Sequence, residues 1–408
     1  MEQLMKQMET VKNDVGMRWE MVRLGDVCKI LGGTTPSTNN PEFWDGDLIW
    51  LSPTDLPEVG TIATNLDSKR KITSKALSKC ALELLPINSI VFSTRASIGK
   101  IGIVNRPLCT NQGFTNLIPN SNVHHKYLAY ALKNNISNIS KLGNSTTFNE
   151  VSRTSIKNFQ IPLPPLPIQK RIAEILDAAD ALKRKDQELL KKYDELAQAI
   201  FIDMFGDPVK NEKGWEVKSI GESIDFMTSG SRGWAQYYSK NGDLFLRINN
   251  VGYNEMKLQD LIYVTAPNNA EAIRTEIKSG DILLSITADL GRTCVIPDNF
   301  PKAFINQHLA ILRLKKEYEP FFVSQVLSSE FGKLQFKKLN KGGVKAGLNF
   351  DDIKSLEFIN PPIKNQAKYK KMLAEVLKQS DEIIAINKKS NSLFQALIQK
   401  AFNGELVA

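Results

Sequence analysis

The spacing of apolar residues divides the chain into two kinds of region. Residues 18–160 and 213–360 contain short apolar runs rich in Val, Ile and Phe, and Gly, Asn, Pro or Ser bounds each run. Such runs are typical of strands. After each region, apolar residues return every three or four positions, which indicates a long helix. The pattern predicts a mixed α/β (α+β) fold in which two α/β domains alternate with two long helices.

The apolar positions of both helices fit a coiled-coil seam. Nine of ten seam positions from 168 to 200 are apolar, as are seven of ten from 369 to 401. Because an average step of 3.5 residues is typical of coiled coils, we expect the two helices to pair. The alternative is that each helix packs separately on its own domain. The expected core residues are Ile168, Ile172, Ile175, Leu182, Asp186, Leu189, Tyr193, Leu196, Ile200, Leu373, Val376, Ile383, Asn387, Phe394 and Leu397.

The two halves of the chain repeat one another. WEMVRLGDV, beginning at Trp19, matches WEVKSIGES, beginning at Trp215. Residues 87–104 match 277–296, and 143–156 parallel 341–353, in the same order in both halves. A repeat at a fixed offset indicates a duplicated structural unit.

Proline-rich hinges at 162–167 and 361–362 mark the ends of the two α/β regions, because proline ends a helix or a central strand. The predicted division is a helical N-terminal segment (1–17), a first α/β domain (18–163), a central helix (164–206), a second α/β domain (207–362) and a C-terminal helix (363–408).

Composition narrows the class of protein only a little. A formal net charge of +9 suits a polyanionic partner, although many proteins without a nucleic-acid role are as basic. No apolar run is long enough to cross a bilayer, and the first residues lack the apolar core of a secretory signal. The four cysteines (Cys28, Cys80, Cys109 and Cys294) are far apart, which favours reduced thiols in the cytoplasm and argues against a zinc site.

Several motifs recur at matching places in the two halves or end them. They are the two tryptophan openings, the S-x-R-x-x-I-G strand around Arg95, the Asn-Gln pairs, the PLPPLPIQ hinge and the terminal LIQKAFNGEL. Together they resemble the specificity subunits of type I restriction–modification systems, over nearly the whole chain. The second half departs from the pattern, because SITADLG lacks an arginine at the place of Arg95 and INPPIKNQ is a degenerate hinge.

This resemblance implies a fold and a set of partners. Two tandem target-recognition domains would each read one half of a bipartite site in double-stranded DNA. The two long helices would pair as an antiparallel coiled coil and recruit two methyltransferase (modification) subunits, and restriction/translocase subunits would join this complex. Apolar residues at 201–205 and 402–406, with the exposed flanks of the helices, are the candidate methyltransferase-docking surfaces.

Two short motifs imitate catalytic sites. Asn360-Pro361-Pro362-Ile363 resembles the turn with which amino-methyltransferases hold a flipped base, but Ile363 stands where that turn needs an aromatic ring. Glu276-Ile277-Lys278 has the E-x-K form of many nucleases, without a suitable acidic partner. No phosphate-binding GxxxxGK[ST] loop is present. We therefore expect no catalytic residue, cofactor or metal in this chain.

DNA reading needs hydrogen-bonding side chains on exposed loops and cations for phosphates. The candidates in the first half are Thr34, Thr35, Ser37, Thr54, Asp55, Arg95, Ser97, Lys100, Asn111, Gln112, Ser145 and Thr147. Those in the second half are Ser231, Arg232, Arg247, Asn249, Asn250, Thr287, Asp289, Arg292, Asn306, Gln307, Lys341 and Lys345. Each could instead be a turn or strand-end residue, and the Asn-Gln pairs could satisfy buried backbone groups.

Asp186 and Asn387 are equivalent polar interruptions near the middle of the two seams. In an antiparallel pair they would face each other, with the carboxylate accepting the amide N–H and fixing the register.

Other functions also fit the sequence: the specificity arm of another type of restriction–modification enzyme, an active methyltransferase, or a coiled-coil scaffold with no DNA role.

Overall fold

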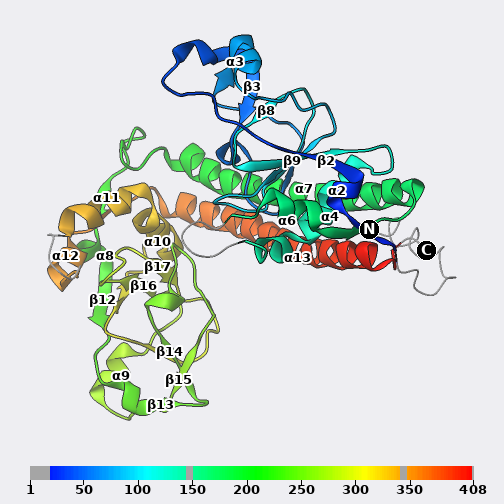
Figure 1. Ribbon diagram of the computed structural model, residues 1–408. Coiled ribbons are helices and arrows are strands. Elements are labelled where there is room, and N and C mark those ends of the chain that lie inside the picture. The colour runs from blue at the N-terminus through cyan, green and yellow to red at the C-terminus, as the bar shows by residue number, and fades with distance from the viewer. Residues whose placement is uncertain (1–18, 144–149, 341–346, 407–408) are drawn as a thin grey trace. The chain divides into compact units, whose positions relative to one another are not determined.

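The computed structural model describes residues 19–143, 150–340 and 347–406, and these form two compact units (Figure 1). Unit 1 contains the chain up to Glu188 together with the end from Ile384, and unit 2 is Leu189–Ile383. Each unit holds one α/β region and one half of each long helix. The predicted helical segment 1–17 lies outside the described residues.

Unit 1 is built on a five-stranded sheet with the order β2-β9-β6-β7-β4. Its neighbouring strands are antiparallel except β4, which is parallel to β7. A second sheet, β5-β3-β8, follows from the loop after β2. The strands are β2 Cys28–Gly32, β3 Trp44–Leu51, β4 Ile62–Ala63, β5 Lys71–Ile72, β6 Ile90–Ser93, β7 Ile101–Ile103, β8 Cys109–Thr110 and β9 Phe114–Pro119.

Unit 2 repeats this plan with two four-stranded sheets, β12-β19-β16-β17 and β13-β15-β14-β18. In both units the second sheet contains one parallel pair, β3 with β8 and β14 with β18. The strands are β12 Ile224–Ser229, β13 Tyr238–Ser239, β14 Asp243–Leu246, β15 Ile262–Val264, β16 Ile282–Ser285, β17 Thr293–Val295, β18 Ala303–Ile305 and β19 Leu309–Leu314.

Short elements close each unit. The ribbon β1-β10 in unit 1 corresponds to β11-β20 in unit 2, and both are antiparallel. Their bounds are β1 Met21–Arg23, β10 Gln160–Pro162, β11 Val217–Ser219 and β20 Glu357–Ile359. The shorter helices are α2 Leu24–Val27, α3 Ser74–Lys79, α4 His125–Asn134, α5 Ile136–Ser140, α6 Arg153–Asn158, α8 Ile220–Ser223, α9 Ala270–Thr275, α10 Pro320–Ser328, α11 Glu330–Leu339 and α12 Phe350–Lys354, with 3₁₀ turns Pro41–Phe43, Pro53–Asp55, Trp234–Tyr237 and Ile248–Asn250.

The central strand of each large sheet is buried on both faces. Ile90 and Phe92 of β6 join the core beneath α4, whereas Val91 joins the core shared with β3. Side chains alternate in the same way along β16, where Leu283 faces the second sheet. A strand covered on both faces is apolar at every position, which explains the unbroken apolar runs in the sequence.

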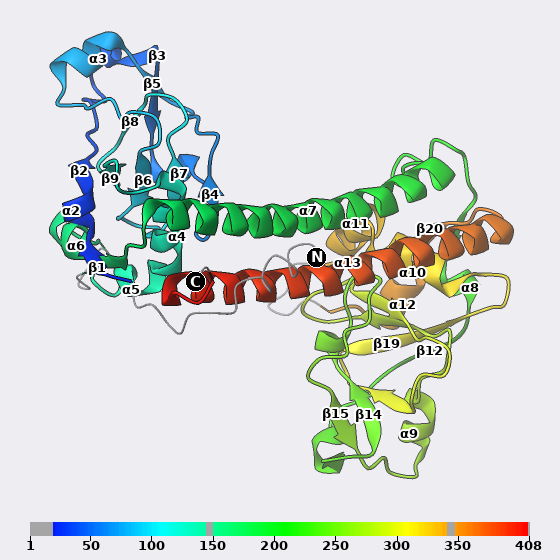
Figure 2. The same cartoon turned by 90° about the vertical axis from the view of Figure 1, so that its right-hand side faces the viewer.

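The long helices are α7, Leu166–Phe205, and α13, Ile363–Asn403. In unit 1 the beginning of α7 lies beside the end of α13 (Figure 2), and Leu176 and Phe394 share one core. In unit 2 the end of α7 packs with the beginning of α13, where Tyr193 Oη donates to Gln379 Oε1 over 3.1 Å. The helices are therefore antiparallel in each unit, which confirms the expected fold class.

Equivalent glutamines fix the start of each long helix. The fully buried Gln169 donates from Nε2 to the carbonyls of Pro164 and Asn122, and its Oε1 accepts the His124 N–H. Gln366 makes the same kind of link in unit 2, because it donates to the Pro361 carbonyl and accepts the Glu319 N–H. Each glutamine thus ties a proline hinge to the loop that precedes α4 or α10.

The predicted seam is only partly correct. Ile172, Leu373, Val376, Phe394 and Leu397 are buried. Leu189 and Leu196 were expected in the core, but their exposed fractions are 37% and 45%. The buried face of each half-helix also packs on α4 or α10, and this wider contact draws in residues outside the 3.5-residue seam, such as Leu176.

The predicted pairing of Asp186 with Asn387 is wrong. The buried Asp186 accepts a hydrogen bond of 2.7 Å from Ser390 Oγ rather than from Asn387. Asn387 Oδ1 accepts from Asn391 on its own helix, and Asn387 Nδ2 is buried with no hydrogen-bond partner among the described residues. Ser390 lies one helical turn beyond Asn387, so the observed partner is the next polar position of the same seam.

Candidate nucleic-acid interface

A tight hairpin after the central strand carries several of the candidates in each unit. Ser93 Oγ accepts the Lys100 N–H at 2.8 Å and donates to the Ser97 carbonyl at 2.5 Å. Ser285 Oγ makes the same two bonds with Arg292 and Asp289. This shared turn projects the residues between the two ends of each hairpin out of the sheet.

The hairpins also share a left-handed backbone. Ala96 and Gly99 have φ values of 57° and 99°, and Ala288 and Gly291 have 59° and 86°. Because matching residues adopt the same conformation and the same hydrogen bonds, Arg95 in unit 1 is equivalent to Thr287 in unit 2. The alignment of VFSTRASIGK with LLSITADLGR from the sequence therefore holds at the level of single hydrogen bonds.

The Asn-Gln turn lies against a glycine of the loop after the first sheet strand. A Cβ atom on Gly33 would stand 1.9 Å from the Asn111 carbonyl oxygen, and one on Gly230 would stand 2.3 Å from that of Asn306. Only glycine permits this approach. The Asn111 side chain accepts the Gly113 N–H, and Asn306 accepts the His308 N–H, so both asparagines serve the turn.

In unit 1 these loops surround one hollow, which we call corner 1. It is about 370 Å³ in volume. Arg95 Nε binds Glu150 Oε1 at 2.7 Å, and both side chains are about half exposed. Glu150 raises the pKa of Arg95 through this hydrogen bond. The Thr35 hydroxyl hydrogen-bonds Gln112 Oε1 at the same place. The lining residues are Gly32, Gly33, Thr94, Arg95, Gln112, Phe114, Thr115, Glu150, Val151, Ser152, Arg153 and Thr154.

The equivalent place in unit 2, which we call corner 2, is built around His308 and Ser231, and the Ser231 hydroxyl donates to Glu271. His308 Nδ1 is 2.6 Å from Thr287 Oγ1, and His308 Nε2 is 3.0 Å from Gln307 Nε2. Ser231 pairs with Asn306 through a parallel β-bridge, which brings the loop after β12 to the same point. Corner 2 therefore consists of Ser231, Thr287, Asn306, Gln307 and His308.

The structure rules out Lys100 and Asn250 as DNA contacts. Lys100 is buried, and its Nζ donates to the carbonyls of Pro53 and Leu56 at 3.0 Å. Asn250 is also buried, and its Nδ2 donates to the carbonyls of Lys257 and Gln259. Both side chains satisfy backbone carbonyls that would otherwise be unpaired, and neither can reach a DNA groove.

Other candidates lie at the surface outside the two corners. Ser37, Thr54, Ser97, Arg232 and Asn249 are exposed. Asp289 binds Arg292 Nε at 2.6 Å and accepts from Tyr253 Oη at 3.1 Å. Arg247 donates to the Asp260 carbonyl, Asp55 caps the Ser52 turn, and the Thr34 carbonyl accepts the Trp50 indole N–H. Ser145, Thr147, Lys341 and Lys345 lie outside the described residues.

Sequence reasoning missed several residues of the corners, among them Glu150, Arg153 and His308. Glu150 and Arg153 approach Arg95 only because the segment before α6 folds back onto the hairpin, where Arg95 and Glu150 form an isolated bridge. His308 follows the Asn-Gln pair directly and could have been chosen, since a histidine in place of Gly113 is a visible difference between the repeats.

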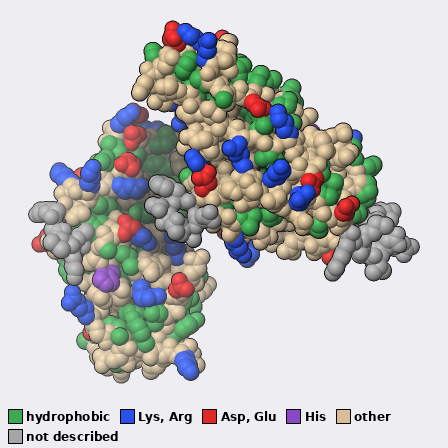
Figure 3. Space-filling model, in the orientation of Figure 1, with side chains coloured by type: hydrophobic (Ala, Val, Ile, Leu, Met, Phe, Trp, Pro, Cys, Tyr) green, Lys and Arg blue, Asp and Glu red, His purple; other side chains and the backbone are tan. Residues whose placement is uncertain are grey.

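Charge alone does not locate the interface. On the face shown in Figure 3, Lys and Arg side chains are spread over both units and interspersed with Asp and Glu. Among the described helices, none has the length and apolar character that crossing a membrane demands.

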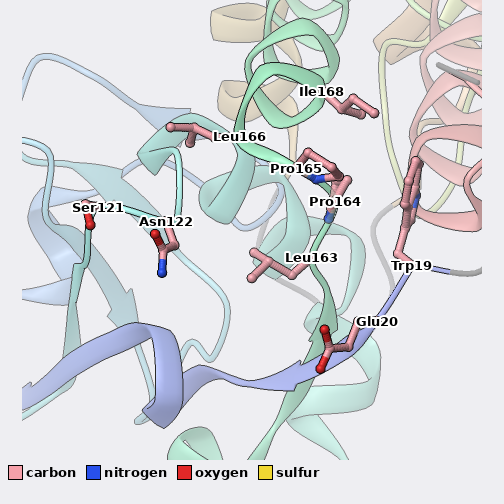
Figure 4. A pocket seen from close by; sticks show the side chains of 9 residues that line it. All are labelled: Trp19, Glu20, Ser121, Asn122, Leu163, Pro164, Pro165, Leu166 and Ile168. Atoms are coloured by element: carbon pink, nitrogen blue, oxygen red, sulfur yellow. The ribbon is translucent and has the colours of Figure 1, made fainter.

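The proline hinges have a structural role at the start of each long helix. Figure 4 shows Trp19, Leu163, Pro164 and Pro165 around a hollow at the start of α7. The catalytic-looking Asn360-Pro361-Pro362 turn holds the equivalent position in unit 2, where Asn360 Oδ1 accepts from Gln366 Nε2 over 3.1 Å. Phe201 and Phe205, considered for docking, are instead buried against Phe322 in the core of unit 2.

Comparisons with known proteins agree with this duplicated architecture. The family model described as "Type I restriction modification DNA specificity domain" matches residues 17–192 and again 212–393. The MjaIX specificity subunit of Methanocaldococcus jannaschii is 28% identical, over 98% of this chain and 96% of that protein. The EcoR124I/EcoR124II specificity subunit of Escherichia coli is 35% identical, over 44% of this chain and 45% of that protein.

Solved structures share the fold. The crystal structure of the S subunit of a type I restriction–modification system from M. genitalium has a TM-score of 0.60 at 15% identity, over 96% of this chain and 98% of the other. A chain from a study of type I R-M complex assembly and conformational transition has a TM-score of 0.57 at 20% identity, over 97% of this chain and 100% of the other.

Proposed function

We propose that this chain, which belongs to the type I restriction–modification DNA specificity family, reads a bipartite site in double-stranded DNA with one half-site per unit. The chain is the specificity subunit of such a system and not its catalytic subunit. In this proposal corner 1 and corner 2 each enter a groove of the DNA and contact base edges.

The duplicated corner is the observation that carries this proposal. Each unit places a polar hairpin residue, Arg95 or Thr287, beside an amide, Gln112 or Gln307, at the same point of the same fold. Arginine and glutamine side chains recognise guanine and adenine edges by paired hydrogen bonds. Exposed cations over the two units would supply contacts to phosphates, which position the protein without reading sequence.

The remaining parts of the chain deliver partners to the bound site. We propose that the paired helices, including the exposed Leu189 and Leu196, dock two methyltransferase subunits, with restriction/translocase subunits completing a cytoplasmic complex. The division into two recognition domains (18–163 and 207–362) and two helical spacers (164–206 and 363–408) belongs to the same proposal. Exposed leucines on a pair of helices are the kind of surface that a protein partner buries.

The test measures DNA specificity with the full chain in complex with its methyltransferase partner. Arg95→Ala should relax reading at one base pair by about 1–3 kcal/mol and leave the other half-site unchanged. The matched control is Arg106→Ala, which removes an arginine of similar exposure that hydrogen-bonds the Leu66 carbonyl elsewhere in unit 1.

Methylome sequencing of cells that carry each variant gives the readout. Loss of discrimination at one position with Arg95→Ala, and not with Arg106→Ala, supports the proposal. An unchanged methylated motif with both variants would show that corner 1 does not read DNA. Absent or salt-independent DNA binding by the complex would instead support a scaffold without a DNA role.

A further inference from the structure

The two corners hold different chemistry on the same backbone. The equivalent of Arg95 is Thr287, and the place of Gly113 after the Asn-Gln pair is taken by His308. The hairpins match in their hydrogen bonds and positive φ values, so the backbone presents its side chains in the same way in both units. The side chains around this shared backbone, which also include Glu150 where unit 2 has Gly347, therefore set what each corner recognises.

Corner 1 presents hydrogen-bond donors. The guanidinium of Arg95 can only donate, and the Glu150 carboxylate holds it through Nε at 2.7 Å. No described residue pairs with its two terminal nitrogens. The Thr35 hydroxyl hydrogen-bonds Gln112 Oε1, which directs the amide –NH₂ of Gln112 away from Thr35. A ligand at corner 1 therefore meets an arginine and an amide that both offer N–H groups.

Corner 2 presents a donor and an acceptor together. The amide nitrogen of Gln307 can only donate, so His308 Nε2, at 3.0 Å, must accept from it. With Nε2 as the acceptor, the ring N–H is on Nδ1 and donates to Thr287 Oγ1 at 2.6 Å. Gln307 keeps its second N–H and its Oε1 for a ligand, and His308 fixes the orientation of the amide.

We propose that corner 1 reads a guanine and corner 2 reads an adenine, with His308 as the positioning residue for Gln307. The major-groove edge of guanine offers two acceptors, N7 and O6, which suits a corner of donors. The edge of adenine offers the acceptor N7 and the donor N6–H, which suits the remaining N–H and Oε1 of one amide. This inference rests on the proposed function, because it requires both corners to contact bases.

The experiment uses the full chain with its methyltransferase partner and a library of randomised DNA duplexes. Selection and sequencing give the base preference at every position for the unaltered chain and for Arg95→Lys, Gln307→Ala and His308→Ala. Arg95→Lys should reduce discrimination about 10- to 100-fold at one G·C pair of one half-site, because lysine cannot form the paired hydrogen bonds. Gln307→Ala should do the same at one A·T pair of the other half-site.

Modified bases separate a positioning role of His308 from a merely structural one. Replacing the adenine by 7-deazaadenine removes the N7 acceptor, so this substitution should weaken binding of the unaltered chain but not of Gln307→Ala. If His308 acts through Gln307, His308→Ala should weaken discrimination at that same A·T pair, and the double variant should be no weaker than Gln307→Ala. Arg106→Lys is the control and should leave every preference unchanged.

The outcomes distinguish this inference from the proposed function. If Arg95 governs an A·T pair, or Gln307 a G·C pair, the assignment of bases is overturned while base reading by the corners stands. If the variants fold and bind but change no base preference at any position, the corners are not base readers and both proposals fail. Gln112→Ala supplies an independent variant of corner 1 should Arg95→Lys fold poorly, with loss at the same G·C pair as the expected result.

Discussion

Asp186 of α7 and Ser390 of α13 form a buried hydrogen bond of 2.7 Å between the two long helices in unit 1. A carboxylate in an apolar seam costs stability unless its oxygens are hydrogen-bonded. This bond therefore favours one alignment of the two helices over alignments that differ by a turn. In unit 1 this bond has the register-fixing role that the sequence predicted for a pair of Asp186 with Asn387.

Asp186→Ala should lower the free energy of unfolding by about 1–3 kcal/mol, because it leaves the Ser390 hydroxyl buried without its acceptor. Asp186→Asn, which keeps an acceptor oxygen, should cost less. The double variant Asp186→Leu with Ser390→Ala should be nearly neutral or stabilising. Urea unfolding of the full chain measures all three, and a double variant as unstable as Asp186→Ala would contradict this account.

Removing the side chain of Gln169 or Gln366 should lower the free energy of unfolding strongly. Each is fully buried and links a hinge carbonyl to the N–H that precedes α4 or α10. Gln169→Ala and Gln366→Ala should each destabilise by about 1–3 kcal/mol or more, since they leave buried donors and acceptors unpaired. The exposed Gln399 of α13 provides the matched control, and Gln399→Ala should change the denaturation midpoint little.

Lys100→Ala separates a structural role from a phosphate contact. Because the Lys100 ammonium satisfies two buried carbonyls, its removal should lower the unfolding free energy by about 1–3 kcal/mol. The dependence of DNA affinity on salt should stay the same, because a lost phosphate contact would reduce the slope of log K against log salt by about 1. A reduced slope with unchanged stability would restore Lys100 to the DNA interface.

The four thiols should differ in reactivity. Burial raises the pKa of Cys28 and Cys294 to about 12 and that of Cys109 to about 11, whereas Cys80 is partly exposed. The thiolate is the nucleophile, so a raised pKa leaves very little reactive form near pH 8. Iodoacetamide at pH 8 followed by peptide mass spectrometry should label Cys80 first. Early labelling of Cys28 in the folded chain would contradict its burial.

The length of α7 should set the distance between the half-sites. Its 40 residues make a continuous helix of roughly 60 Å. Inserting four residues near Glu188 lengthens the helix by about 6 Å, so the spacer in the methylated motif should change or methylation should stop. Insertion of four residues in the loop after α7 serves as a control for added length outside the helix. An unaltered motif with the helical insertion would exclude the helix as a ruler.

The sequence alone determined the duplicated plan of this protein. Apolar periodicity located both long helices, the proline hinges predicted where they begin to within a few residues, and matching segments aligned the two units. These features depend on local backbone preferences and on side-chain period, which the order of residues encodes directly. The resemblance to type I specificity subunits, made on the same motifs, was confirmed by the family match.

Tertiary structure decided which polar residues are available and which partners they have. Lys100 and Asn250 look like surface residues in the sequence, but folding buries them against backbone carbonyls, which for Lys100 lie more than 40 positions away in the chain. Glu150 reaches Arg95 across 55 positions of the chain, and Ser390 reaches Asp186 across 204. Such contacts arise when elements far apart in the chain pack together, and no local pattern encodes them. For the same reason only the folded corners reveal that equivalent loops offer different hydrogen-bonding groups.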